Sequence, residues 1–189
     1  TDVTVAQLRQ DGFKAIFVAV GTQECIQLGI EGEDLEGVYP VLDYLGQVNR
    51  GEKVALGKNV AIIGGGNAAM DAVRSARRLG AENAFIIYRR GLAEMPANAE
   101  EIEECQQEGI TINTLTQPVR FIGENGNIKA IECIKMQLGE PDASGRRRPI
   151  PIEGSEYDIE LDSVIVGIGQ GANPLLTEAT NDLKVDKRG

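Results

Sequence analysis

The chain is organised around a short apolar run that ends in three glycines and then continues with helical periodicity. Residues 60–63 are all apolar, which is typical of a strand buried on both faces. After the glycines, small and apolar residues recur at helical spacing, and Gly80 follows where a helix would stop. The stripe comprises Ala68, Ala69, Ala72, Val73, Ala76 and Leu79. The pattern predicts a strand, a tight turn and a helix between residues 60 and 80.

The spacing Gly64-x-Gly66-x-x-Ala69 fits the dinucleotide-binding fingerprint in its G-x-G-x-x-A form. Gly64 permits the tight turn, Gly66 lets the backbone approach a pyrophosphate, and the small Ala69 lets the helix pack closely on the sheet. The N–H groups and positive dipole end of the helix would then face the phosphates. A glycine-rich turn without a ligand is the alternative, but the strand before and the helix after the glycines favour a nucleotide site.

Five segments are predicted ahead of this stretch. Residues 5–10 could form a short helix. Residues 14–20 are mostly apolar and close on a glycine, which predicts a second buried strand. The polar, glycine-rich residues 29–37 are expected to form a connector, residues 41–46 a helix, and residues 51–53 a turn.

Two more strands and a helix are predicted after the fingerprint helix. Residues 83–88 and residues 110–112 are apolar runs that we expect to be strands. A helix is expected over residues 96–108, opened by a proline whose missing N–H costs nothing there. Its inward side chains would be Ile102 and Cys105. Its run of glutamates could bind a basic partner, but a solvated helix face is the favoured interpretation.

In the last third of the chain the periodicity changes from helical to alternating. We expect a hairpin around the Asn125-Gly126 turn, an antiparallel strand over residues 157–161, and a buried strand over residues 163–170. Residues 141–151 are interpreted as a polar loop. The arginines at 146–148 could contact a phosphate or an acidic partner, but a solvated loop is the favoured interpretation.

These elements predict an α/β fold, specifically a Rossmann-like FAD/NAD(P)-binding domain. A parallel sheet would be flanked by helices and interrupted by a three-stranded antiparallel crossover meander. The composition agrees, because 23 glycines and 4% aromatic residues suit tight strand–helix turns better than a β-sandwich. The sequence has no apolar stretch of about 18 residues and no visible signal peptide, so we expect a cytoplasmic protein without a membrane span.

Charge and composition exclude several function classes. The net charge of −10 argues against nucleic acid as a partner. Salt screens this field beyond about 8 Å, so local positive groups decide whether a phosphorylated cofactor binds. Histidine is absent, and no catalytic or metal-binding residue is assigned. The cysteines at 25, 105 and 133 form no C-x-x-C pair, so we expect buried thiols in a reducing cytosol rather than a redox or metal site.

The end of the predicted strand 83–88 indicates which dinucleotide binds. In this fold an acidic residue about 20 residues beyond the glycines binds a ribose 2′-hydroxyl, whereas arginine accommodates a 2′-phosphate. The sequence places Arg89 and Arg90 at that point. A guanidinium can bind phosphate oxygens bidentately, so NADP(H) is the predicted cofactor, with two plain surface charges as the alternative. Asn67, at the helix start, could cap the helix or reach the cofactor.

The residues just described resemble the family of the glutamate synthase small (β) subunit, which includes NADPH-dependent flavin and iron–sulfur oxidoreductases. The resemblance covers nearly the whole chain in order. The matching pieces are AIFVAVG at 15–21, GGGNAAMD at 64–71, YRR at 88–90, EMPA at 94–97, GEPDASGRR at 139–147 and VIVGIGQ at 164–170.

The resemblance implies an NADPH-binding domain inserted into an FAD domain. Hydride would pass from NADPH to the flavin, and electrons would continue to iron–sulfur clusters or to a glutamate synthase large subunit. The implied cofactor contacts are Gly64, Gly65, Gly66, Asn67 and Ala68 at the pyrophosphate, Arg89 and Arg90 at the 2′-phosphate, and Gly169 and Gln170 near the nicotinamide.

The same resemblance implies a division of the chain. Residues 1–40 would be a remnant of the FAD-domain strand and its connector, residues 41–170 the NADP(H)-binding domain, and residues 171–189 the start of the return to the FAD domain. The family's cysteine-rich segment and FAD motifs are missing, so we expect FAD in the full-length protein and no turnover by this segment alone. Two alternatives are a regulatory nucleotide-binding domain without turnover and a thioredoxin-reductase-like enzyme, against which the absent C-x-x-C counts.

Overall fold

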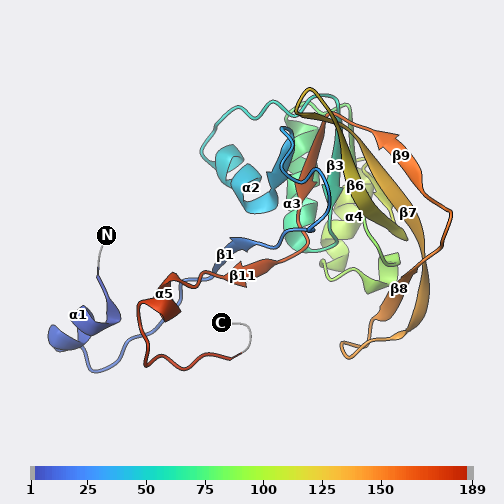
Figure 1. The fold of residues 1–189 in the computed structure, drawn as a ribbon. Coiled ribbons are helices and arrows are strands. Elements are labelled where there is room, and N and C mark those ends of the chain that lie inside the picture. Colours follow the sequence, from blue (N-terminus) through green and yellow to red (C-terminus); the bar gives the residue numbers. More distant parts are fainter. Residues whose placement is uncertain (1–2, 187–189) are drawn as a thin grey trace. The chain divides into compact units, whose positions relative to one another are not determined.

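The computed structural model describes residues 3–186, and the chain divides into two compact units. Unit 1 combines the residues up to Ile26 with those from Gln170 onward, and unit 2 runs from Gln27 to Gly169. Figure 1 draws the fold and labels many of its helices and strands. None of the helices between residues 3 and 186 has the length and apolar character that a bilayer crossing needs.

Unit 1 contains the predicted N-terminal helix, α1 (Val5–Gln10). The helix begins at Thr4, whose side-chain oxygen accepts the N–H of Gln7 at 3.1 Å. Its last turn is tied to the C-terminal part of the unit, because Arg9 Nη1 lies 2.7 Å from Asp182 Oδ2. The prediction of a helix over these residues is confirmed.

The predicted strand over residues 14–20 is wrong. The structure assigns these residues no strand, and the side chain of Phe17 is 93% exposed. The strand of this region is instead β1 (Thr22–Cys25), which pairs antiparallel with β11 (Gln170–Ala172), and α5 (Leu175–Glu178) follows. A continuous apolar run is buried only where neighbouring strands and helices cover it, and no strand described in unit 1 pairs with this run.

The centre of unit 2 is a five-stranded parallel sheet with the order β2-β10-β3-β4-β5. Its strands are β2 (Val38–Pro40), β3 (Asn59–Ile63), β4 (Asn83–Ile87), β5 (Thr111–Asn113) and β10 (Ser163–Val166). The predicted strands at 60–63, 83–88, 110–112 and 163–170 are therefore confirmed, with shifted ends. Since all five strands are parallel, their carboxyl ends meet at one edge of the sheet.

Three helices accompany this sheet, α2 (Val41–Asn49), α3 (Asn67–Arg78) and α4 (Ala99–Gln107). The fingerprint helix α3 buries Ala69, Ala72, Val73 and Ala76 of the predicted stripe. The prediction is wrong at Leu79, which follows the last helical residue and is 56% exposed, and Ala68 is only half-buried. Gly80 comes next, with a φ of +110°. The helix α4 begins three residues later than predicted. Pro96 forces the preceding residue, Met95, into an extended conformation, so a turn of 3₁₀ helix, η1 (Leu92–Glu94), precedes Pro96 and α4 starts after Asn98.

The antiparallel sheet has four strands rather than the predicted three. They are β6 (Thr116–Glu124), β7 (Asn127–Pro141), β8 (Arg147–Pro151) and β9 (Tyr157–Glu160), and the Asn125-Gly126 turn joins the first two as expected. The prediction of a loop over residues 141–151 is wrong at its end, because β8 pairs with the long strand β7. The sequence of β8 contains two prolines, which are typical of a loop. An edge strand can contain proline, because not all of its N–H groups have to donate to a neighbouring strand.

The main core of unit 2 lies between the two sheets. Apolar side chains from β3, β4 and β10 pack there against side chains from β6 and β7. The members include Ala61, Ile63, Ile87, Val164, Phe121 and Ile131. The alternate residues Val60 and Ile62 are also fully buried, on the opposite face, and α3 packs on β3 and β4. The parallel sheet is thus covered on both faces, and its carboxyl edge is left for the site.

Candidate functional site

The first glycine of the fingerprint sits where the strands β10, β3 and β4 end together. Gly64 has a φ of +145°, and its N–H donates to the carbonyl of Ile87 at 3.0 Å. A Cβ at this position would stand 2.2 Å from the carbonyl oxygen of Gly167. The N–H of Gly167 in turn donates to the carbonyl of Ile63 at 2.7 Å. Only glycine fits at position 64, because both the backbone conformation and the space exclude a side chain.

The second glycine faces protein rather than open space. A Cβ at Gly65 would stand 2.6 Å from the ring of Tyr88. The Tyr88 hydroxyl donates to the carbonyl of Glu94 at 2.8 Å, and the N–H of Ala97 donates to the carbonyl of Gly65 at 3.0 Å. These bonds hold the segment between η1 and α4 against residues 64–66, which we call the glycine turn. The fingerprint alone did not predict this role of Tyr88.

The third glycine, Gly66, has free space on the side where a side chain would stand. Gly66 is the N-cap residue of α3, and a Cβ placed on it would have no neighbouring atom within 4 Å, apart from its own chain neighbours. No side chain of the described residues caps the helix. The first N–H groups of α3 lack intrahelical partners, and the helix dipole gives this end a partial positive charge. An uncapped helix end beside free space fits a diphosphate, which supports the predicted dinucleotide.

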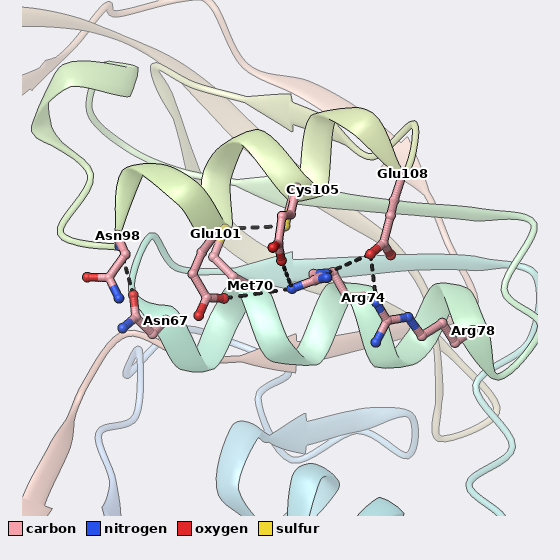
Figure 2. A network of polar contacts seen from close by, with 9 residues as sticks. Asn67, Met70, Arg74, Arg78, Asn98, Glu101, Cys105 and Glu108 are labelled. Carbon is pink, nitrogen blue, oxygen red and sulfur yellow. Dashed lines mark hydrogen bonds and ion pairs between the residues drawn. The ribbon is translucent and has the colours of Figure 1, made fainter.

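Asn67, which the sequence left as either a cap or a cofactor contact, makes a third kind of bond. Its side-chain oxygen accepts the N–H of Asn98 at 2.9 Å and so joins the start of α3 to the start of α4 (Figure 2). The side chain itself is exposed. Ala68, next along the turn, is half-buried. Contacts from these residues to a nucleotide stay predictions.

The two arginines at the end of β4 have different surroundings. Arg89 is exposed, and among residues 3–186 its side chain has no hydrogen bond or ion pair. Arg90 is buried, and its Nη2 lies 2.7 Å from Oδ2 of Asp142, in the turn between β7 and β8. Of the two, Arg89 alone presents a fully available guanidinium. The predicted contact of both arginines with a 2′-phosphate is not tested by this geometry.

The predicted nicotinamide-end residues lie at the boundary of the two units. Gly169 is the last residue of unit 2, has a φ of +142°, and follows β10 at the same sheet edge as Gly64. Gln170 opens β11 in unit 1, where its side-chain oxygen lies 3.2 Å from the Thr22 hydroxyl. Their contact with a nicotinamide remains a prediction.

A charged cluster fixes the two helices next to the site. A guanidinium nitrogen of Arg74 on α3 lies 2.6 Å from a carboxylate oxygen of Glu104, 2.9 Å from one of Glu108 and 4.0 Å from one of Glu101. Figure 2 shows Arg74 between Glu101 and Glu108. Arg78 Nη2 also contacts Glu108, at 2.7 Å. Partial burial raises the pKa of the Glu108 carboxyl, but the hydrogen bonds from both arginines outweigh this effect and hold that pKa below its ordinary value.

The cluster corrects part of the prediction that the glutamates of α4 form a solvated face, since Glu100, Glu103 and Glu104 are exposed as expected but Glu101 and Glu108 are not. The side chains of Glu101 and Glu108 are only 30% and 27% exposed, because they point toward α3. The predicted inward position of Cys105 is confirmed, and its thiol lies 3.6 Å from the sulfur of Met70. The missed signal was the spacing of Glu101, Glu104 and Glu108, which places them on one helix face opposite arginines four residues apart.

The two cysteines of unit 2, Cys105 and Cys133, are buried thiols. Burial raises the pKa of Cys105 to about 11 and that of Cys133 to about 12, so both thiols stay protonated at neutral pH. All three cysteines are free, and Cys25 is half-buried. Between residues 3 and 186, no group of three potential metal-ligating side chains occurs.

A separate cavity of about 320 Å³ lies near the amino ends of β4 and β5. Its lining includes Arg77, Asn83, Gly109, Thr111 and Ile159. Because the glycine turn lies at the carboxyl ends of the strands, this cavity is distinct from the candidate nucleotide site.

Comparison with known proteins places the chain in a family. The family described as "Pyridine nucleotide-disulphide oxidoreductase" matches residues 2–189. The "NADP(+)-dependent formate dehydrogenase subunit beta" of Moorella thermoacetica is 44% identical over 100% of this chain and 27% of its own length. The "Glutamate synthase [NADPH] small chain" of Escherichia coli K12 is 32% identical over 100% of this chain and 42% of its own length. The chain thus spans less than half of these relatives, and the resemblance noted in the sequence is confirmed.

Solved structures confirm the fold. The FprA protein of Mycobacterium tuberculosis in complex with NADPH superposes with a TM-score of 0.68 at 20% identity, over 82% of this chain and 50% of that chain. The thioredoxin reductase of T. acidophilum superposes with a TM-score of 0.63 at 21% identity, over 89% of this chain and 48% of that chain. The predicted α/β class, with a parallel sheet, helices and an antiparallel sheet, is correct.

Proposed function

Because the chain belongs to the pyridine nucleotide-disulphide oxidoreductase family, we propose that it is the NADP(H)-binding module of a flavin-dependent oxidoreductase. The observation that carries the proposal is the open, uncapped amino end of α3 beside Gly66, with the free guanidinium of Arg89 at the end of the neighbouring strand. NADPH, when bound, supplies a hydride to a flavin. The residues of this chain bind and orient the nucleotide.

The diphosphate would lie against the first turn of α3. Gly64 makes the turn, Gly66 leaves the room, and the unpaired N–H groups of Gly66, Asn67 and Ala68 would donate to the phosphate oxygens. Gly65 and Asn67 hold the segment before α4 against this turn, so they fix one wall of the site. Preorganised donors of this kind lose little entropy when the ligand binds.

The 2′-phosphate would be read at the end of β4. Arg89 is the proposed direct contact, and Arg90 is its neighbour whose guanidinium Asp142 already holds. Residues 85–93 contain no aspartate or glutamate, so no carboxylate on this strand end favours a free ribose hydroxyl. The names of several relatives specify NADP(+) or NADPH, which agrees with this choice.

The rest of the electron path belongs to the proposal as well. The relatives are up to several times longer than this chain, so FAD would be held by the full-length protein, with electrons passing on to iron–sulfur clusters or a glutamate synthase large subunit. Gly169 and Gln170 would lie near the nicotinamide. We place the protein in the cytoplasm, because its three free thiols suit a reducing compartment.

The test is titration of the chain with NADPH and with NADH, followed by nucleotide fluorescence. We expect tighter binding of NADPH, and Arg89→Ala should remove most of the difference. Arg148→Ala is the matched control, because Arg148 is an exposed arginine on the edge strand β8. Equal affinities of the unaltered chain for both nucleotides would refute the NADP(H) assignment. Binding without reduction of FAD in the full-length protein would instead support a regulatory domain.

A further inference from the structure

The turn between β7 and β8, residues 142–146, is joined to the end of β4 by a chain of side-chain contacts. Asp142 Oδ2 accepts a hydrogen bond from Arg90 Nη2 at 2.7 Å. The hydroxyl of Ser144 donates to Asp142 Oδ1 at 2.5 Å, and Arg146 Nε donates to the Ser144 hydroxyl oxygen at 3.0 Å. The guanidinium groups of Arg90 and Arg146 are therefore linked through one carboxylate and one hydroxyl.

Hydrogen bonds within residues 142–146 hold the conformation of the turn. The N–H of Asp142 donates to the carbonyl of Arg146 at 2.8 Å, and the N–H of Gly145 donates to the carbonyl of Asp142 at 2.9 Å. Hydrogen bonds from Ser144, with the nearby charge of Arg90, hold the pKa of the Asp142 carboxyl down at about 2. The carboxylate is thus ionised at any working pH, and the link to Arg90 persists.

The arginines that meet here differ in what they can offer a ligand. The side chain of Arg90 is only 8% exposed, and its Nε is buried without a partner among the described residues. Arg146 is half-buried, and only its Nε is bonded within residues 3–186, so both terminal nitrogens are left. Arg89 is exposed and wholly available. Asp142 balances the charge of Arg90. Of these three arginines, Arg89 and Arg146 are the two without a carboxylate partner among residues 3–186.

We infer that Arg146 is a second phosphate-binding residue of the nucleotide site, and that Asp142 and Ser144 position it while Arg90 anchors the turn to β4. The inference rests on the proposed function, because it assigns the residues that hold the 2′-phosphate. A phosphate monoester carries about 1.5 to 2 negative charges at neutral pH, which two guanidinium groups can match. Arg146 belongs to the loop that the sequence analysis interpreted as solvated, and this inference assigns it a phosphate-binding role.

The first test compares two arginines of the same hairpin. The probes are 2′,5′-ADP, which carries the 2′-phosphate, and 5′-ADP, which lacks it. Arg146→Ala should weaken 2′,5′-ADP binding about tenfold, the equivalent of one charge-assisted hydrogen bond, and leave 5′-ADP unchanged. Arg148→Ala removes the same charge two residues away, so long-range attraction alone predicts equal losses. A loss of less than about twofold is expected for this control, because an exposed charge is screened.

The second test uses the sign of the effect at Asp142. A carboxylate near a phosphate repels it, so simple charge removal predicts that Asp142→Asn tightens 2′,5′-ADP binding. A positioning residue predicts the opposite, a loss comparable to that of Arg146→Ala with 5′-ADP again unchanged. Asp158→Asn, an exposed acid on β9, is the matched control. If Asp142→Asn unfolds the hairpin by circular dichroism, Ser144→Ala breaks the same link and should show the same selective loss.

The outcomes separate this inference from the proposed function. If the unaltered chain fails to prefer 2′,5′-ADP over 5′-ADP, the NADP(H) assignment itself fails. If that preference exists and Arg146→Ala behaves like Arg148→Ala, the inference is overturned and the assignment stands. Tighter binding by Asp142→Asn, or an equal loss for both probes, would refute the positioning role.

Discussion

The space that a side chain would need at Gly64 is filled by the carbonyl oxygen of Gly167, 2.2 Å from the position of a Cβ. This relationship holds the end of β10 against the start of the glycine turn. Two residues later the situation reverses, because Gly66 faces open space. The two glycines of one fingerprint therefore serve different ends, packing in the first case and ligand access in the second.

Alanine substitutions at these glycines should separate stability from binding. Gly64→Ala should lower the free energy of unfolding by about 2 to 5 kcal/mol, because it adds a clash to a strained φ. Gly66→Ala should cost only about 1 kcal/mol, since its backbone conformation suits alanine but alanine is a poor N-cap. Its methyl group should nevertheless weaken NADPH binding roughly tenfold or more. Urea unfolding and nucleotide titration measure the two effects.

Either of two results for Gly66→Ala would contradict the assignment of Gly66 to ligand access: an unfolded protein, or unchanged NADPH binding. The first result would mean that position 66 is packed, and the second that no ligand approaches it.

The contacts of Arg74 with α4 should contribute measurably to stability. Arg74→Ala removes the partner of the half-buried Glu101 and one of the two arginine partners of Glu108, so we expect a loss of about 1 to 2 kcal/mol in the free energy of unfolding. Glu103→Gln is a suitable control on the same helix, because Glu103 is exposed and accepts only a hydrogen bond from Gln107. Chemical denaturation at neutral pH gives both free energies of unfolding. Equal losses for Arg74→Ala and Glu103→Gln would contradict a specific stabilising contribution of the Arg74 contacts.

The lowered pKa of Glu108 predicts how this contribution depends on pH. The folded-state pKa lies below the ordinary value of 4.5, so the stabilisation is fully present above pH 4.5 and is lost as the pH falls through the folded pKa. Glu108→Gln should be less stable than the unaltered protein at pH 7, and the difference should shrink on acidification below 4.5. Thermal unfolding across pH 3 to 7 tests this, and a constant difference would contradict it.

The thiols should report the burial of the core. Cys105 and Cys133 are fully buried and their pKa values are raised, whereas Cys25 is half-buried. We expect a colourimetric thiol reagent to titrate only Cys25 rapidly in the native protein and all three cysteines after unfolding. Rapid native reaction of Cys133 would show that the two sheets are not packed as described.

The fold of unit 2 could be predicted from the sequence because its signals are local. The apolar run 60–63, the glycine spacing and the Asn125-Gly126 turn each encode their own geometry. The errors arose where burial depends on distant partners. Residues 14–20 have the composition of a buried strand, but no described strand of unit 1 covers them. The strand β8 was missed because its prolines resemble a loop, although the long strand β7 supplies it with a partner.

The site was only partly predictable for the same reason. The open Gly66 follows from the fingerprint, since the motif specifies the turn. The different surroundings of Arg89 and Arg90 could not be foreseen, because the partner of Arg90 is Asp142, which lies 52 positions further along the chain. The bond from Asn67 to the start of α4 likewise depends on how α3 and α4 pack.

The central claim is that a dinucleotide binds at the amino end of α3, and amide chemical shifts during titration with NADP(+) test it most directly. We predict that the largest changes occur at Gly65, Gly66, Asn67 and Ala68, with a further change at the Nε–H of Arg89. Shifts that centre instead on the cavity near Thr111, while the glycine turn stays unchanged, would contradict the account.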